Sequence, residues 1–313
     1  MPVPPRTASA TVRAARIPID WGSLVPLRLR SKIIAEGVYA GMHRSVRRGP
    51  GVEFGGHRPY VPGDDLRFID RRSLLRHDRL MVREFETETD RALWLVVDAT
   101  ASMSYRGPDA PGAKVAYAAV CAAGLARVAL ASGDPVGLVW IGGDGVRALP
   151  AMGGREAFER VLGTLEGAGA AGDASGDDQA MDRALMPIAR RARRGATVVL
   201  FSDLLDLPPG AMASFGALGS GGRTPVVVWV LDPAEAKLSF QGNVRLRALE
   251  GGAVVEADAD AVRATYLERL RAVGDGWERE LTARGGRFVA CTSGDDPAGV
   301  VRQVVRSLGE ARR

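Results

Sequence analysis

Cysteine is scarce in this chain, because only two of its 313 residues are cysteines. Cys121 lies in an Ala-Val-Cys-Ala-Ala sequence, and Cys291 ends the sequence Arg-Phe-Val-Ala-Cys. Cysteines in such apolar surroundings behave as small core residues and do not provide a disulfide framework. This excludes the class of small secreted proteins that disulfides hold together.

Histidine and long apolar runs are also lacking. The three histidines are His43, His57 and His77, and their spacing fits no common metal-binding motif. No stretch approaches the roughly 18 consecutive apolar residues that a transmembrane helix needs, and the Pro- and Arg-rich N-terminus has no apolar signal core. We therefore expect a soluble cytoplasmic protein with no membrane span and no histidine metal site.

The common catalytic motifs are missing as well. The chain has no Gly-x-x-x-x-Gly-Lys-Ser/Thr loop for binding phosphates and no Gly-x-Ser-x-Gly turn for a nucleophilic serine. A phosphatase with an aspartyl nucleophile would usually have a second Asp two residues after the first, where this chain has Thr100. These absences favour a protein that is not an enzyme.

Positive charge is present but unevenly distributed. Residues 1–90 contain 16 Lys and Arg against 11 Asp and Glu, whereas the rest of the chain contains 26 of each. A basic N-terminal part can contact nucleic acid or an anionic membrane surface. No nucleic-acid-binding motif accompanies the arginines, so we favour a solvated face or a docking surface for an acidic protein.

The length and the 46% hydrophobic content suit one large α/β domain with an additional segment. We expect residues 1–20 to form a disordered or loosely attached tail. Residues 21–90 contain a basic amphipathic helix over residues 24–46, followed by an extended segment of mixed charge over residues 47–90. Residues 91–313 form the main domain.

Short apolar runs alternate with helical patterns through the main domain. The runs cover residues 93–97, 136–141, 197–201, 225–231 and 287–291. Strands that alternate with helices predict a doubly wound, mostly parallel sheet. We expect the N-terminal basic helix and the extended segment to pack on this α/β domain.

Oxygen-bearing side chains follow two of these runs. Asp98, Thr100 and Ser102 come after the first run, and Asp203 follows the run at 197–201. If the two strands are neighbours where the strand order reverses, these four side chains converge. Hard oxygen ligands suit Mg²⁺ or Mn²⁺, and Asp178 in the intervening loop is a further candidate ligand. The alternative is that these residues only close a turn and cap the next helix.

Asp-x-Thr-x-Ser after a buried strand, with a later strand that ends in Ser-Asp, resembles a von Willebrand factor A domain and its metal-ion-dependent adhesion site. A second pattern lies upstream, in the extended segment. It resembles the hallmark of the bacterial domain of unknown function 58 family and consists of Phe54, Arg58, Tyr60, Pro62, Gly63, Asp64, Asp65, Arg67 and Asp70. Of these, Arg58, Tyr60, Asp64, Asp65, Arg67 and Asp70 are our candidate partner-binding residues.

The chain departs from these patterns at three places. Arg71 stands where the hallmark usually has Trp, and Thr100 stands where the adhesion site commonly has Ser. The adhesion site's second-loop Thr has no match, and Asp177, Asp178 or Gln179 lies in that place.

The resemblance implies a function. Such proteins are thought to act as non-enzymatic adaptors with MoxR-type AAA+ ATPases, in chaperone-like maturation or assembly of other proteins. Two alternatives arise from the residues themselves. One is a metal-dependent phosphohydrolase that uses the same carboxylates, and the other is nucleic-acid binding by the basic N-terminal part.

Overall fold

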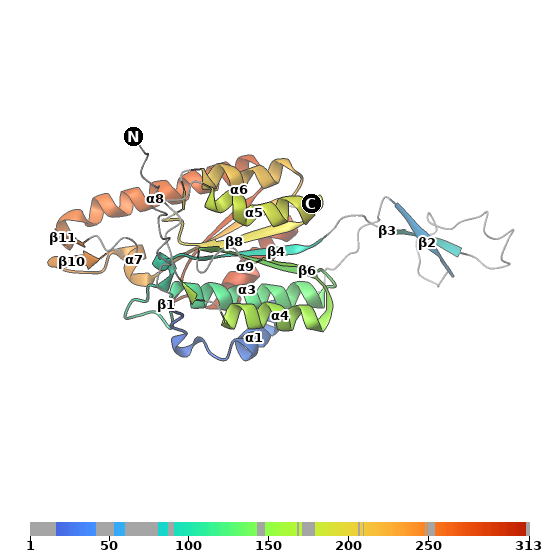
Figure 1. Cartoon of the computed structure of the whole chain (residues 1–313), viewed down its shortest axis with the longest axis horizontal. Coiled ribbons are helices and arrows are strands. Elements are labelled where there is room, and N and C mark those ends of the chain that lie inside the picture. Colours follow the sequence, from blue (N-terminus) through green and yellow to red (C-terminus); the bar gives the residue numbers. More distant parts are fainter. Residues whose placement is uncertain are drawn as a thin grey trace, which may run out of the picture.

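The structure is a computed structural model that describes residues 17–41, 53–59, 81–86, 91–142, 148–167, 169–170, 179–205, 207–208, 210–247, 249 and 254–310. Its centre is a six-stranded sheet with the strand order β12-β9-β8-β4-β5-β6 (Figure 1). The strands are β4 (Leu93–Ala99), β5 (Val136–Gly142), β6 (Ala148–Met152), β8 (Thr197–Ser202), β9 (Thr224–Leu231) and β12 (Arg287–Thr292). All neighbours pair in parallel except β6, which runs antiparallel to β5. The predicted fold class is therefore confirmed.

Helices cover both faces of the sheet (Figure 1). One face carries α1 (Leu27–Gly41), α3 (Lys114–Ala131), α4 (Gly154–Glu166) and α9 (Pro297–Glu310). The other carries α5 (Ala180–Arg191), α6 (Ala211–Ser220) and α8 (Ala259–Ala283). Because successive side chains of a strand point to opposite faces, β4 contributes Leu95 and Val97 to the first core and Trp94 and Val96 to the second. This explains why the central strand is apolar throughout.

The basic helix α1 packs on its own domain, as expected. Its residues Leu27, Ile34 and Val38 are buried in the same core as α3. The two helices approach closely at Gly124, where an added Cβ would lie 2.5 Å from Cγ2 of Ile34. The helix begins at Leu27 and not at Leu24, because Gly22–Leu24 forms a short 3-10 helix (η1) and Pro26 follows it. The expected end of the helix, residues 42–46, lies outside the described residues.

Within the described part of the chain, α3 is the one helix long and apolar enough to cross a membrane by length and composition. Most of it (78%) is buried inside the fold, where it is the central helix of the first core. A core helix of a soluble protein commonly meets the same criterion, so α3 is weak support for a membrane span.

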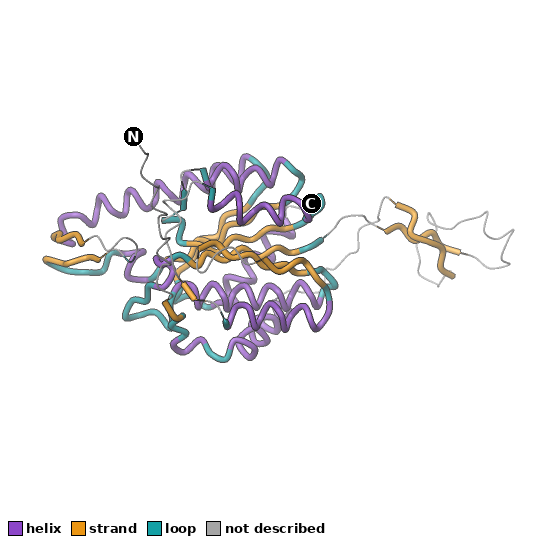
Figure 2. The backbone as a smooth tube through the Cα atoms, viewed as in Figure 1, coloured by secondary structure: helices purple, strands orange, loops and turns teal. Residues whose placement is uncertain are grey.

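Several short elements surround the sheet (Figure 2). They are β1 (Ile17–Pro18), β7 (Gly169–Ala170), the 3-10 helix η3 (Ala101–Ser104), α7 (Pro233–Lys237), β10 (Asn243–Arg247) and β11 (Val254–Asp258). The strands β10 and β11 pair as an antiparallel hairpin that the sequence analysis did not predict.

The extended segment contributes a second antiparallel pair, β2 (Glu53–Pro59) and β3 (Met81–Glu86), drawn at the right of Figure 1. Arg58 lies in β2, opposite Val82. The other candidate partner-binding residues lie outside the described residues, namely Tyr60, Asp64, Asp65, Arg67 and Asp70. The packing of this segment on the domain and the boundaries at residues 20 and 90 therefore stay predictions.

Candidate functional site at the strand-end edge

The site lies where the strand order reverses. β5, the next strand in the chain, pairs with one edge of β4. β8, which comes later in the chain, pairs with the other edge of β4. The pairing runs from Leu93 opposite Thr197 to Val97 opposite Phe201, so the polar residues that end both strands lie at one level. The predicted neighbourhood of the two strands is confirmed.

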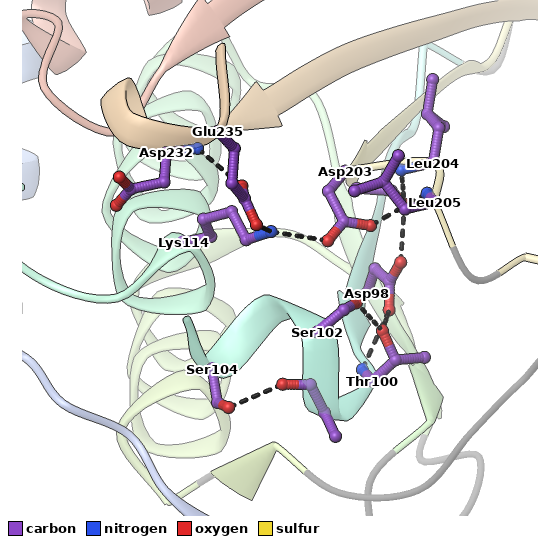
Figure 3. Close-up of polar contacts among 12 residues, drawn as sticks. Asp98, Thr100, Ser102, Ser104, Lys114, Asp203, Leu204, Leu205, Asp232 and Glu235 are labelled. Atoms are coloured by element: carbon purple, nitrogen blue, oxygen red, sulfur yellow. Dashed lines mark hydrogen bonds and ion pairs between the residues drawn. The ribbon is translucent and has the colours of Figure 1, made fainter. Parts of the chain in front are cut away.

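Asp98 near the end of β4, Thr100 after the strand and Ser102 of η3 come together at the strand end (Figure 3). Oδ1 of Asp98 accepts hydrogen bonds from the backbone N–H of Thr100 (2.9 Å) and from its hydroxyl (2.8 Å). The hydroxyls of Thr100 and Ser102 are 3.0 Å apart. Oδ2 of Asp98 accepts from the hydroxyl of Ser202, at the end of β8, at 2.6 Å. Asp98 thereby joins the ends of β4 and β8.

This geometry partly matches the turn-closing alternative. The bond from the Thr100 N–H to Asp98 closes a tight turn, as that alternative requires. Thr100 precedes η3, yet its side chain makes no capping hydrogen bond to that helix. The hydroxyls of Thr100 and Ser102 instead meet each other beside the carboxylate.

Asp203 directs its carboxylate to a residue that the sequence analysis did not single out. Its Oδ2 accepts a hydrogen bond from Nζ of Lys114 at 2.8 Å, and its Oδ1 accepts from the N–H of Leu205 at 3.1 Å. The indole N–H of Trp229, on the adjacent strand, donates to the backbone oxygen of Asp203 at 2.7 Å. Asp203 is completely buried together with Lys114.

Lys114 also binds Glu235, and this contact brings α7 into the site. Its Nζ lies 2.8 Å from Oε1 of Glu235, while Oε2 of Glu235 accepts from the N–H of Asp232. Asp232 begins α7 with a capping box, and its Oδ2 accepts from the N–H of Gly107 at 2.8 Å. An added Cβ at Gly107 would lie only 2.2 Å from Oδ1 of Asp232, so glycine permits this close approach.

Burial controls the electrostatics of the site. Burial, and then the charge of Asp203, raise the pKa of Asp98 from 3.8 to about 6, against the hydrogen bonds from Ser202 and Thr100. Burial alone would lower the pKa of Lys114, but Asp203 and Glu235 raise it above its ordinary value. The two carboxylates therefore favour the charged ammonium form of Lys114. Burial also raises the pKa of Glu235, although Lys114 acts in the opposite direction.

Within the described residues, the donor set that the sequence predicts for Mg²⁺ or Mn²⁺ is only partly assembled. Three of the four predicted ligands come together, but the carboxylate of Asp203 is engaged by Lys114. Asp178 lies outside the described residues, and the neighbouring Gln179 is exposed. Within the described part of the chain, no group of three or more His, Cys, Asp or Glu residues is arranged to hold a metal ion.

Sequence reasoning missed Lys114 and Glu235. A signal for each was present in the sequence. Lysine is rare in this chain, which has only Lys32, Lys114 and Lys237 among its 42 basic residues, and Lys114 starts a helix whose one other charged residue is Arg127. Glu235 is the third residue after Asp232, which is the spacing of a capping box. Their pairing across 121 residues of sequence is visible only in the folded chain.

A family model and several sequence relatives match most of this chain. The family model described as "Protein of unknown function DUF58" matches residues 56–275. An uncharacterized protein of Mycobacterium tuberculosis is 31% identical over 296 residues, which cover 93% of this chain and 89% of the relative. A protein of Mycobacterium bovis, also uncharacterized, gives the same values.

Solved structures that this chain resembles are more distant. BatB from Bacteroides thetaiotaomicron is 16% identical over 70% of this chain and 98% of its own, with a TM-score of 0.44. The von Willebrand factor A domain of SpRpn10 is 10% identical over 68% of this chain and 94% of its own, with a TM-score of 0.38. The fold class follows from the order and pairing of the strands in the central sheet. The family follows from the sequence matches. The chain belongs to the DUF58 family, and its fold is the doubly wound, mostly parallel α/β architecture that the sequence predicts.

Proposed function

We propose that this protein is a non-enzymatic adaptor that binds a MoxR-type AAA+ ATPase, its client protein, or both, during maturation or assembly of the client. The observation that carries the proposal is the construction of the strand-end edge, which we define as Asp98, Thr100, Ser102 and Asp203. Its carboxylates are buried and hydrogen-bonded within the protein, whereas Ser102 is half-buried and reaches the surface. A rigid polar loop of this kind suits recognition of another protein.

The same construction argues against catalysis. A metal-dependent phosphohydrolase needs carboxylates that reach a metal ion or water, but Asp98 and Asp203 are no more than 1% exposed. The described residues of the edge also place no histidine beside them. Our proposal therefore assigns no catalytic residue.

Two surfaces are candidates for docking. One is the strand-end edge, and the other is the hallmark segment, which we define as Arg58, Tyr60, Asp64, Asp65, Arg67 and Asp70. The mixed charges of the hallmark segment suit electrostatic steering of a charged partner. The partner hydrolyses ATP, so the proposal also places this protein in the cytoplasm.

A pull-down with a MoxR-type ATPase from the same organism tests the proposal. Ser102→Ala should weaken capture at least several-fold if the strand-end edge docks the partner. Ser220→Ala is the matched control, because Ser220 is exposed at the end of α6, near the opposite edge of the sheet. Capture that Ser102→Ala leaves unchanged but that falls steadily with rising salt would assign docking to the hallmark segment.

A chelator provides a further arm of the same experiment. Loss of capture on addition of a chelator would support the Mg²⁺ or Mn²⁺ that the sequence predicts, while unchanged capture would indicate docking without a metal. Absence of association with the ATPase in every salt and chelator condition would contradict the adaptor proposal for that partner.

A further inference from the structure

The two aspartates that the sequence assigns to a metal already have protein donors on all their carboxylate oxygens. Both oxygens of Asp98 accept from hydroxyl or backbone donors of Thr100 and Ser202. Both oxygens of Asp203 accept as well, from Lys114 and Leu205. Direct coordination of a cation by Asp203 would therefore have to compete with a buried ion pair.

The side chain of Lys114 is fully buried, and its ammonium group is paired with two carboxylates. Its side chain has no solvent exposure, and its Nζ lies 2.8 Å from a carboxylate oxygen of both Asp203 and Glu235. The ring of Tyr105 also faces the ammonium group, with its centroid 5.9 Å from Nζ. A buried charge is tolerated only when it is paired and hydrogen-bonded, and Lys114 meets this condition with two carboxylates.

The surrounding charges leave little need for a second cation. Lys114 offsets the negative charge of Asp203 at 2.8 Å, and Asp203 directly follows Ser202, whose hydroxyl donates to Asp98 at 2.6 Å. A divalent ion among the same carboxylates would lie next to a buried ammonium group. Like charges repel strongly in a poorly solvated interior, so the two cations would exclude each other.

We propose that Lys114 is the resident cation of the strand-end edge, in the place where the sequence predicts Mg²⁺ or Mn²⁺, so that the edge forms without a metal. The proposal stands whether or not the chain binds an ATPase, because its test uses the purified protein alone. It accounts for the missing second-loop Thr, since a site without a metal does not need that ligand.

The first test is metal titration of the wild-type full chain. Calorimetric titration with MgCl₂ or MnCl₂ should give only the heat of dilution, and the Tm should be the same in excess Mg²⁺, in excess Mn²⁺ and in excess EDTA. A ligand that binds the folded state at a hundred times its Kd would raise the Tm measurably. A Tm increase with either metal that disappears in Asp98→Ala would overturn the proposal.

The second test is Lys114→Met, which keeps the length of the side chain but removes its charge. Asp203 and Glu235 then lack their cation, so the Tm should fall, and Mg²⁺ or Mn²⁺ should raise it again. Lys237→Met is the matched control, because Lys237 is exposed at the end of α7, and this variant should show neither effect.

The triple variant Lys114→Met, Asp203→Asn, Glu235→Gln removes the carboxylates together with the cation. This variant should fold, and its Tm should not change with Mg²⁺ or Mn²⁺. Comparing its Tm with that of Lys114→Met separates the effect of unbalanced charge from the effect of lost packing. A folded Lys114→Met protein whose Tm ignores both metals would contradict the assignment of Lys114 to a cation position. If Lys114→Met does not fold even with metal, the wild-type titration decides.

Discussion

At the scale of single residues, the two buried aspartates of the site differ in the hydrogen-bond donors that they bind. Asp98 is held by uncharged hydroxyl and amide donors, whereas Asp203 is held by an ammonium group. Hydrogen bonds from neutral groups offset the cost of burying a charge less well than an ion pair does. Burial therefore raises the pKa of Asp98, against the hydrogen bonds from Ser202 and Thr100.

The raised pKa of Asp98 predicts a dependence of stability on pH. The pKa is about 6 in the folded protein and 3.8 for an ordinary Asp, so the folded state holds this proton more tightly. The resulting stabilisation is complete below pH 3.8 and is lost as the pH rises through about 6. Two pKa units correspond to at most about 3 kcal/mol, and we expect a change on the order of 2 kcal/mol.

Asp98→Asn isolates this contribution, because it removes the charge and keeps the volume. The free energy of unfolding of the variant, minus that of the wild type, should increase between pH 4 and pH 8. Urea denaturation at several pH values measures the difference, and Glu235 titrates in both proteins and cancels. Asp275→Asn, on the exposed side of α8, controls for the removal of a surface charge. A difference that stays constant with pH would contradict the prediction.

Sequence reasoning found half of this residue-level arrangement. Asp98, Thr100, Ser102 and Asp203 could be predicted, because polar residues that directly follow apolar strands must lie at the strand ends. Lys114 was missed, because a lysine at the start of a helix is usually solvated, and only its tertiary neighbours show that it is buried. The predicted metal and the observed lysine are two ways to offset the same negative charge.

At the scale of elements, the contact between α1 and α3 explains why a basic helix belongs to the domain. Its arginines lie on the outside, while Ile34, which is 4% exposed, packs against the helix backbone at Gly124. The small residue allows the close approach of the two helices, so the two positions should be energetically coupled.

A double-mutant cycle tests this coupling. Ile34→Ala should cost about 2–4 kcal/mol through loss of buried surface. Gly124→Ala should cost about 1–3 kcal/mol, because its Cβ would lie 2.5 Å from Cγ2 of Ile34. The double variant should cost less than the sum, since the new methyl group enters the space that Ile34 leaves.

Gly163→Ala in α4, where a Cβ meets nothing within 4 Å, should instead stabilise by about 0.5–1 kcal/mol. Additive costs measured by urea denaturation would show that the helices do not meet here.

Apolar patterns predicted the elements of the core well and the peripheral ones poorly. The central strands begin and end within two residues of the expected positions, because burial on both faces requires an uninterrupted apolar run. The hairpin of β10 and β11 escaped prediction because it has no buried face. Leu246 and Val255, which lie opposite each other in it, are 38% and 59% exposed.

At the scale of the whole molecule, the attachment of the N-terminal part defines where proteolysis should stop. The chain is tied down from Ile17 onward, because β1 pairs with β7, the N–H of Ala113 donates to the backbone oxygen of Asp20, and Arg106 forms an ion pair with the Asp20 carboxylate. Limited proteolysis should remove roughly the first 20 residues and leave α1 on the domain. Mass spectrometry of the stable fragments gives the answer. A stable core that begins near Arg91 would show that α1 and the hallmark segment form a separate unit.

The overall topology could be predicted from the alternation of strands and helices, and the neighbourhood of β4 and β8 from the shared polar ending. The contact between Glu235 and Lys114 was not predicted from the sequence. Glu235 reaches Lys114 only because α7 folds back over the end of β9, and no local pattern determines that path.

The antiparallel strand β6 has a consequence for how this protein meets other molecules. It forms one rim of the central sheet, and its middle residue, Pro150, has no amide hydrogen to donate. Its register with β5 is also interrupted between Val136 and Leu138. A strand from another molecule therefore meets an incomplete row of backbone hydrogen-bond donors along β6. This disfavours extension of the sheet by a second copy of the chain or by an unfolded protein. For the adaptor function that we propose, this rim would therefore be a poor site for aggregation with client proteins.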